Sequence, residues 1–241
     1  MISDEYFQSK LAFRGRGLAD LDRLIGGVGD TIDALSTTRN PVRILELGCG
    51  YGTALLELAA RYGDRVTLTG VNRNRHDGNP EILIRNAVVH GLWSANETAR
   101  KLPSLHYADV ARGLPFADAA FDLVYSQVAW MYFGDKLAVL RHVMRVLAPD
   151  GIAKIDVDEL RPGLPNEYRR LVEIWEKGKL VPFGDYVRRY GVDLLPAREG
   201  QYLRFGPVRD FASDVELVLE IDASTIHADW DGIKCVYRVT P

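Results

Sequence analysis

The sequence predicts an α/β protein with a doubly wound, mostly parallel sheet of seven strands and helices on both faces. From Val42 onward, short apolar runs alternate with helical stretches, which is the pattern of repeated βαβ units. Closely spaced glycines follow the first apolar run, and two β-rich runs lie near the end of the sequence. We therefore also expect one antiparallel strand at the end of the sheet, and a helical cap or lid outside it.

Each element of the core is predicted from its local pattern. Apolar runs bounded by turn residues predict strands at residues 42–47, 66–71, 105–108, 121–125 and 151–157. Apolar or amphipathic stretches predict helices at residues 53–62, 80–90 and 134–147. We expect one domain over residues 1–241, with a helical cap at 1–38, the core at 42–160, an insertion or lid at 161–210 and a terminal strand pair at 211–241.

The parts outside the core are less regular. The cap is expected to pack over the C-terminal edge of the sheet. The insertion holds two close prolines and an aromatic-rich stretch, and we expect a helix near residues 167–177. The terminal pair consists of runs at 215–221 and 233–239, joined by 222–232, and one of its strands is expected to be antiparallel.

Composition limits the possible functions. The chain has 241 residues, 47% hydrophobic and 26% charged, as in an ordinary globular protein. A formal charge of −3 disfavours nucleic acid as the main partner. No apolar run is long enough to span a bilayer, so we expect no membrane partner. Two cysteines do not make a disulfide framework, which favours a cytoplasmic location. No Cys/His cluster has the spacing of metal ligands, and the oligomeric state, a homodimer included, stays open.

The glycine turn at residues 48–52 is the first candidate for chemistry. It lies between a predicted strand and a predicted helix, where glycines let a ligand approach the backbone and the helix start offers free N–H groups. Its spacing is Gly-x-Gly-x-Gly, whereas a pyrophosphate site has Gly-x-Gly-x-x-Gly. Glu46 precedes it, and a carboxylate there suits a ligand with a cationic amino group. The alternative is a tight connection without a ligand.

The run from Ile44 to Gly52 resembles the first motif of class I S-adenosylmethionine-dependent methyltransferases. Three further segments, at residues 106–110, 114–124 and 147–151, resemble later motifs of the same family. The resemblance covers residues 42–157, about half the chain, and implies a Rossmann-like fold that binds S-adenosylmethionine and releases S-adenosylhomocysteine. The cofactor-binding residues that we expect are Glu46, Gly48, Cys49, Gly50, Asn72, Arg73, Asp109, Val110, Ser126, Gln127 and Arg14.

The resemblance assigns some of these residues a part of the cofactor. Asp109 accepts a hydrogen bond from the adenine amine, Ser126 and Gln127 face the methionine part, and Arg14 meets the carboxylate. The family normally has an acid at the end of strand two to hold the ribose hydroxyls. This sequence has Asn72 there, which can accept a hydrogen bond but without the strength that charge adds.

An alternative function comes from the residues that follow Asn72. Arg73 and Arg75 could pair with a ribose 2′-phosphate, as in an NADP-dependent reductase. Glu46, Asp109 and the glycine spacing argue against that function, and so does the absence of a Tyr-x-x-x-Lys pair. Two more functions stay open: methyl transfer to a macromolecule, and binding of the cofactor without methyl transfer.

The expected reaction is methyl transfer to a small-molecule acceptor. It proceeds mainly by positioning for in-line displacement, and a general base is needed only when the acceptor is protonated. Trp130 and Tyr132, after strand four, and Tyr186, in the lid, are candidates to line the acceptor pocket, with core packing as the alternative. Asp158, after strand five, and His227, on the loop between the terminal strands, are the candidate catalytic residues.

Overall fold

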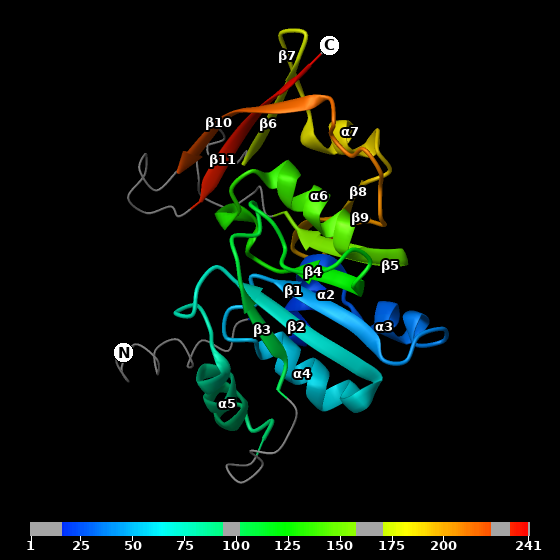
Figure 1. The fold of residues 1–241 in the computed structure, drawn as a ribbon, viewed down its shortest axis with the longest axis vertical. Coiled ribbons are helices and arrows are strands. Elements are labelled where there is room, and N and C mark those ends of the chain that lie inside the picture. Colours follow the sequence, from blue (N-terminus) through cyan, green and yellow to red (C-terminus); the bar gives the residue numbers. More distant parts are fainter. Residues whose placement is uncertain (1–15, 94–101, 158–170, 223–231, 241) are drawn as a thin grey trace.

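The computed structural model describes residues 16–93, 102–157, 171–222 and 232–240, and it contains a seven-stranded sheet and a four-stranded sheet. The seven strands lie in the order β3-β2-β1-β4-β5-β9-β8 (Figure 1). Their bounds are β1 Val42–Leu47, β2 Val66–Asn72, β3 Ser104–Tyr107, β4 Phe121–Ser126, β5 Leu147–Asp156, β8 Asp193–Ala197 and β9 Gly200–Phe205. This sheet confirms the predicted fold class.

Strand directions follow from the pairing. The strands β3, β2, β1, β4 and β5 pair in parallel, each with its neighbour. Strand β9 pairs antiparallel with β5, and β8 pairs antiparallel with β9, so β8 again runs in the direction of β5. Among the described strands of this sheet, β9 alone is therefore antiparallel to the rest. The chain order reverses between β1 and β4, which is where open sheets of this kind bind ligands.

One face of the sheet is covered by α2 (Leu18–Ile25), α3 (Gly29–Leu35) and α4 (Thr53–Tyr62). Their apolar side chains share one buried cluster with strand residues such as Ile44, Leu68 and Leu123. Helix α5 (Pro80–Val89) packs beside α4 through a smaller cluster. The short 3-10 helix η1 (Gly63–Arg65) links α4 to β2.

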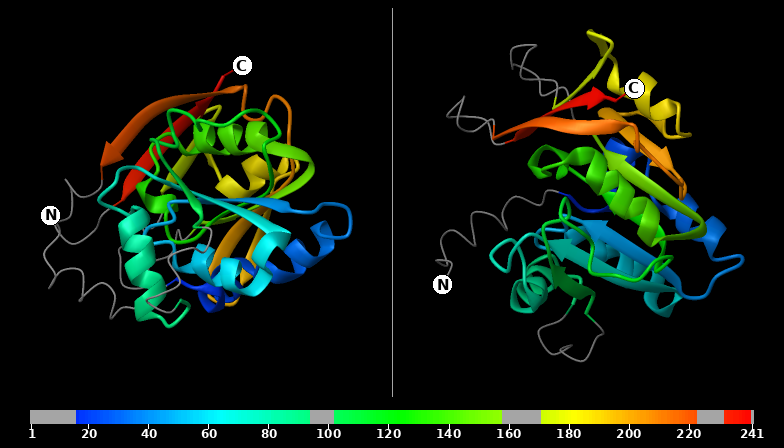
Figure 2. Two further views of the ribbon diagram at one scale, coloured as in Figure 1. Left: turned by 60° about the horizontal axis from the view of Figure 1, so that its bottom comes forward. Right: turned by 45° about the horizontal axis from the view of Figure 1, so that its top comes forward.

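The other face is covered by α6 (Lys136–Val146), which follows the 3-10 helix η2 (Trp130–Tyr132). Asp135 caps the start of this helix, because its carboxylate accepts a hydrogen bond from the Ala138 N–H at 3.0 Å. Six of its residues are completely buried: Lys136, Leu137, Val139, Leu140, Val143 and Val146. Figure 2 shows α6 between the large sheet and the smaller one.

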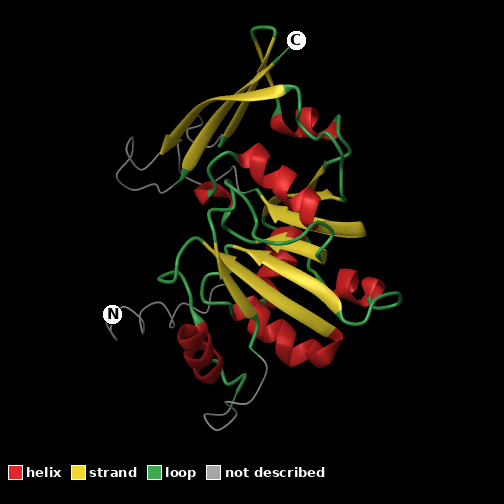
Figure 3. Cartoon of the chain, viewed as in Figure 1, coloured by secondary structure: helices red, strands yellow, loops and turns green. Residues whose placement is uncertain are grey.

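The smaller sheet has the order β10-β11-β6-β7. Its strands are β6 Val172–Glu176, β7 Lys179–Val181, β10 Val215–Asp222 and β11 Ile233–Val239, and α7 (Phe183–Arg188) follows β7 (Figure 3). The Tyr237 hydroxyl on β11 donates to Asp135 at 2.9 Å and accepts from the Leu137 N–H at 3.1 Å. These two bonds attach the smaller sheet to the start of α6.

Several expectations about these outer parts were wrong. Residues 172–176 are a strand, not part of a helix, because buried and exposed side chains alternate there as in a half-buried strand. The pair β10 and β11 is antiparallel as expected but belongs to the smaller sheet. The last two places of the large sheet are taken by the β8–β9 hairpin, from within the predicted lid. Helices α2 and α3 cover a face of the sheet, not its C-terminal edge.

Candidate functional site

The candidate site lies at the carboxyl ends of β1 and β4, where the strand order reverses. The glycine turn leads from β1 into α4, and residues 126–129 follow β4. The predicted residues Gly48, Ser126 and Gln127 are brought together there.

The glycines of the turn have two different roles. Gly48, Gly50 and Gly52 all have positive φ angles, of 68°, 52° and 70°. A Cβ on Gly48 would lie 2.5 Å from the Cβ of Ala129, so Gly48 allows close packing against the segment after β4. A Cβ on Gly50 would meet no atom of the described residues within 4 Å. Gly50 therefore borders space that a ligand can occupy.

Asn72 holds the turn in place through two hydrogen bonds to Gly50. The Gly50 N–H donates to Asn72 Oδ1 at 2.8 Å, and Asn72 Nδ2 donates to the Gly50 carbonyl at 3.0 Å. The Asn72 side chain is only 2% exposed. A carboxylate could accept the first bond but could not donate the second, which explains an amide at this position. The residue expected to bind the ribose thus binds the turn.

Glu46 is buried beneath the site and accepts two hydrogen bonds. The Tyr125 hydroxyl donates to its Oε2 at 3.1 Å, and Gln127 Nε2 donates to its Oε1 at 3.0 Å. Burial raises the pKa of Glu46 to about 7, while these two hydrogen bonds and the charge of Arg16 act in the opposite direction. Near neutral pH, Glu46 can therefore exchange between its neutral and ionised forms.

Gln127 also reaches the segment before α2, because its Nε2 donates to the Arg16 carbonyl at 3.0 Å. Its Oε1 is buried and has no hydrogen-bond partner within the described part of the chain. This oxygen and Glu46 are acceptors that suit an ammonium group. Ser126 is fully buried, and its hydroxyl donates to the Leu47 carbonyl at 3.0 Å, so it joins the ends of β4 and β1.

Val128 has a φ angle of 53°, which is unfavourable for a β-branched residue. Its N–H donates to Asp156 Oδ2 at 2.9 Å, and Asp156 is 1% exposed at the end of β5. Strain of this kind needs support from surrounding contacts and is concentrated at functional sites. No local pattern in the sequence marks Tyr125 or Val128, because their importance depends on contacts between strands.

Asp109 and Val110 follow β3. Asp109 Oδ1 accepts from the Ala111 N–H at 3.1 Å, and its Oδ2 lies 3.6 Å from Arg112 Nε. Asp109 is half-exposed and Val110 is buried, so a polar acceptor stands beside an apolar side chain. Arg73 is exposed in the loop after β2, and the guanidinium of Arg75 lies 5.4 Å from the centre of the Tyr107 ring.

The remaining predicted residues are divided between the core, the surface and the undescribed segments. Cys49 is buried and lies against Gly70, with a raised thiol pKa caused by burial. Trp130 is 1% exposed and packs near Phe133 and Phe183. Tyr132 is 45% exposed.

Tyr186 is fully buried, and its hydroxyl donates to Asp214 at 2.8 Å, so its environment is that of a structural residue. Arg14, Asp158 and His227 lie outside the described residues. His227 was expected near the site because β10 and β11 were assigned to the large sheet, and that premise is wrong.

Among the residues that the structure describes, no group of three or more His, Cys, Asp and Glu side chains is arranged to hold a metal ion. Nor does any helix in the described ranges have the length and apolar character needed to cross a membrane.

The site geometry defines a class of protein: an open α/β sheet with a glycine turn and a buried acid at its switch point. The comparisons with known proteins identify the family. The family described as "Methyltransferase domain" matches residues 45–155. An O-methyltransferase (rstn1) of Aspergillus nomiae is 30% identical over 191 residues, which is 78% of this chain and 76% of that protein. This chain belongs to the class I S-adenosylmethionine-dependent methyltransferases, whose cofactor is S-adenosylmethionine.

Two further similarities are more limited. A glycine/sarcosine/dimethylglycine N-methyltransferase of Actinopolyspora halophila is 35% identical over 109 residues, 45% of this chain and 17% of that protein. The chain thus spans only a small part of that relative. A SAM-dependent methyltransferase structure from Aquifex aeolicus has a TM-score of 0.50 at 14% identity, covering 81% of this chain and 96% of that one, and it supports the fold alone.

Proposed function

We propose that this protein transfers the methyl group of S-adenosylmethionine to a small molecule that carries a hydroxyl group. The observation that carries the proposal is the space beside Gly50 together with the buried acceptors of Glu46 and Gln127 at the carboxyl ends of β1 and β4. The relatives named as O-methyltransferases match 78% and 77% of this chain, whereas three named as N-methyltransferases of the glycine type match 45%, 53% and 54%. The longer matches favour an oxygen acceptor.

The residues at the site fit the cofactor in three places. The carboxylate of Glu46 and the buried Oε1 of Gln127 suit its ammonium group. The surface at Gly50 lets the cofactor approach the backbone, because glycine has no side chain to intervene. Asp109 can accept a hydrogen bond from an amine, with Val110 as an apolar neighbour. Asn72 does not take the ribose-binding role in this proposal, because it is bonded to Gly50.

The bound cofactor supplies a methyl group on a positively charged sulfur. The contribution of the chain is to bind and orient the two reactants and to exclude water, which in well-oriented systems is worth about 7–11 kcal/mol. A hydroxyl acceptor must also lose its proton. We propose Asp158 for this step, because it follows Asp156 by two residues beyond the end of β5. Tyr132, with its exposed ring after β4, is the proposed acceptor contact.

The test has a binding step and a transfer step. Calorimetry of the full chain should show binding of S-adenosylhomocysteine, with weaker binding by Glu46→Gln. Transfer of labelled methyl groups is then measured against a panel of phenols, aliphatic alcohols and amines. Transfer to a hydroxyl compound, lowered in Asp158→Asn, is the expected result.

Different results would overturn particular parts of the proposal. No binding of S-adenosylhomocysteine would contradict the assignment of the cofactor site. Transfer to amines alone would contradict the oxygen acceptor. Binding without transfer to any compound would favour a protein that holds the cofactor and moves no methyl group.

A further inference from the structure

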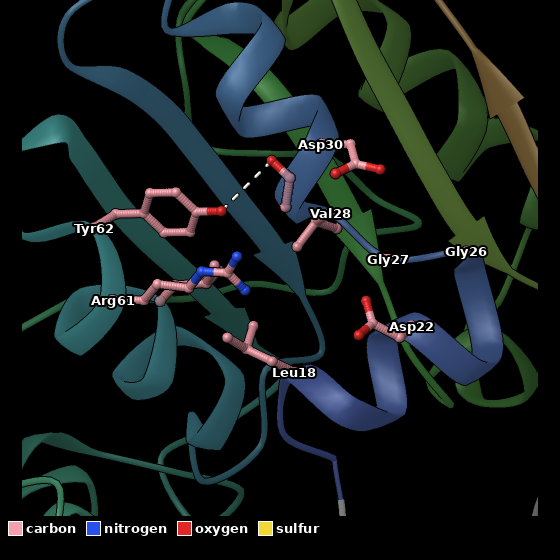
Figure 4. Close-up of a pocket in the computed structure, with 10 residues that line it drawn as sticks. Leu18, Asp22, Gly26, Gly27, Val28, Asp30, Arg61 and Tyr62 are labelled. Atoms are coloured by element: carbon pink, nitrogen blue, oxygen red, sulfur yellow. Dashed lines mark hydrogen bonds between the residues drawn. The ribbon is translucent and has the colours of Figure 1, made fainter.

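A second candidate site lies away from the glycine turn, between α2, α3 and α4 (Figure 4). It is a hollow of about 250 Å³, which we call the charged hollow. Its walls include Asp22 on α2, the glycine-rich loop at residues 26–29, Asp30 on α3, and Arg61 with Tyr62 at the end of α4. The glycine turn lies at the opposite end of α4, so one helix connects two separate sites.

The loop that forms one wall of the charged hollow is held in place. The Gly27 N–H donates to the Leu21 carbonyl at 3.0 Å, where α2 ends. On the side of the sheet, Lys154 Nζ donates to the Gly27 carbonyl at 2.6 Å. The Tyr62 hydroxyl reaches the Gly29 carbonyl at 3.5 Å. The charged hollow is therefore largely formed before any ligand enters, as is usual for small-molecule sites.

Three exposed charged side chains point toward the charged hollow from three helices (Figure 4). Asp22 and Asp30 lie on one side and Arg61 on the other. Over the described ranges, neither acid makes an ion pair or a hydrogen bond, and no ion pair joins Arg61 to either of them. The Arg61 guanidinium lies 5.3 Å from the centre of the Tyr62 ring. A charge of each sign is thus available to a ligand.

We propose that the charged hollow binds a free amino acid and prefers a basic one such as L-lysine. Its ammonium group would lie between Asp22 and Asp30, and its carboxylate would accept paired hydrogen bonds from Arg61. The volume of about 250 Å³ leaves room for a whole free amino acid, L-lysine included. This site is distinct from the proposed cofactor site and does not depend on the proposed function.

The test is a titration of the full chain with L-lysine, L-alanine and L-glutamate, followed by calorimetry or by NMR. S-adenosylhomocysteine is added first where it binds, so that the cofactor site is filled. Two carboxylates on the wall favour L-lysine over L-alanine, and L-alanine over L-glutamate. Asp22→Asn combined with Asp30→Asn, and separately Arg61→Gln, should each weaken L-lysine binding by about tenfold or more.

Matched controls are present on the same surface. Asp33 and Arg65 pair with each other at 3.1 Å and lie outside the lining of the charged hollow in the described chain. Asp33→Asn and Arg65→Gln should therefore leave L-lysine binding unchanged. The proposal is overturned when none of the three amino acids binds at about 10 mM, or when the hollow variants bind as tightly as the controls. A failure of methyl transfer does not affect this test, because its readout is binding.

Discussion

The polar residues near the two ends of α4 differ in burial and in hydrogen bonding. At its start, Glu46, Asn72 and Ser126 are buried and bonded to neighbouring groups. At its end, Asp22 and Arg61 are exposed and face an open hollow. Buried polar groups that are bonded to one another are costly to disturb, whereas exposed charges contribute little to stability. Substitutions at the first site should therefore affect folding as well as cofactor binding, whereas those at the second should affect binding alone.

The largest expected effect is that of Gly48→Ala. The new Cβ would lie 2.5 Å from the Cβ of Ala129, at a φ angle of 68°. Overpacking and the left-handed backbone together should lower the free energy of unfolding by about 2–5 kcal/mol, measured by urea denaturation. The control is Gly50→Ala, where no atom of the described chain lies within 4 Å and only a backbone cost of about 1–2 kcal/mol is expected. Equal losses in the two variants would contradict the different roles assigned to these glycines.

The second effect is a dependence on pH through Glu46. Its pKa is raised to about 7 in the folded chain from 4.5, so between these values the folded state holds a proton that the unfolded state has lost. Stability from this group is therefore present below about pH 4.5 and falls as pH rises toward 7, by up to about 3 kcal/mol. Denaturation from about pH 5 to 8 should show this slope in the natural chain and a flatter one in Glu46→Gln.

The control for the pH experiment is Glu81→Gln, on an exposed part of α5, which should keep the natural slope. The same ionisation should govern the cofactor. An ammonium group prefers the ionised form of Glu46, so the affinity for S-adenosylhomocysteine should fall below pH 7, by up to about tenfold per unit. An affinity that is independent of pH would place the ammonium group elsewhere.

The third effect is smaller and concerns Asn72→Asp. The carboxylate would lose the hydrogen bond that Asn72 Nδ2 donates to the Gly50 carbonyl and would place two acceptors side by side. The expected loss of stability is about 1–3 kcal/mol. Asn74→Asp is the matched control, because the Asn74 side chain accepts hydrogen bonds from the His76 and Asp77 N–H groups through Oδ1, an oxygen that an acid retains. Equal stability of the two variants would show that the bond to the Gly50 carbonyl is unimportant.

The core of the fold could be predicted because its signals are local. The helix at residues 53–62 and the strands beside it follow from short apolar runs and turn residues, and the structure places them with only small changes at their ends. The β8–β9 hairpin was missed although Gly200 marks its turn, because Pro196 lies within the strand and is untypical of one. Strands β10 and β11 belong to the smaller sheet, which is attached to the start of α6 through Tyr237. A local sequence pattern does not reveal a contact of this kind.

In the candidate site, too, local features could be predicted and contacts between distant segments could not. Its glycines and Glu46 could be recognised from their spacing, because the turn needs those residue types. The bonds from Tyr125 to Glu46 and from Asn72 to Gly50 join different strands or a strand and a turn, and they depend on the directions of side chains. The charged hollow could not be predicted, because its charged residues come from three helices and no local sequence pattern shows how these helices pack together.

The smallest expected effect is at Asp22. Its carboxylate is exposed and has no ion-pair partner within the described part of the chain, so Asp22→Asn should change the free energy of unfolding by less than about 0.5 kcal/mol. Urea denaturation at neutral pH measures this change. A loss above about 1 kcal/mol would mean that Asp22 supports the fold, for example through the charge of Lys154 behind the loop. A negligible change, together with weaker binding of L-lysine, would separate recognition from stability at this end of α4.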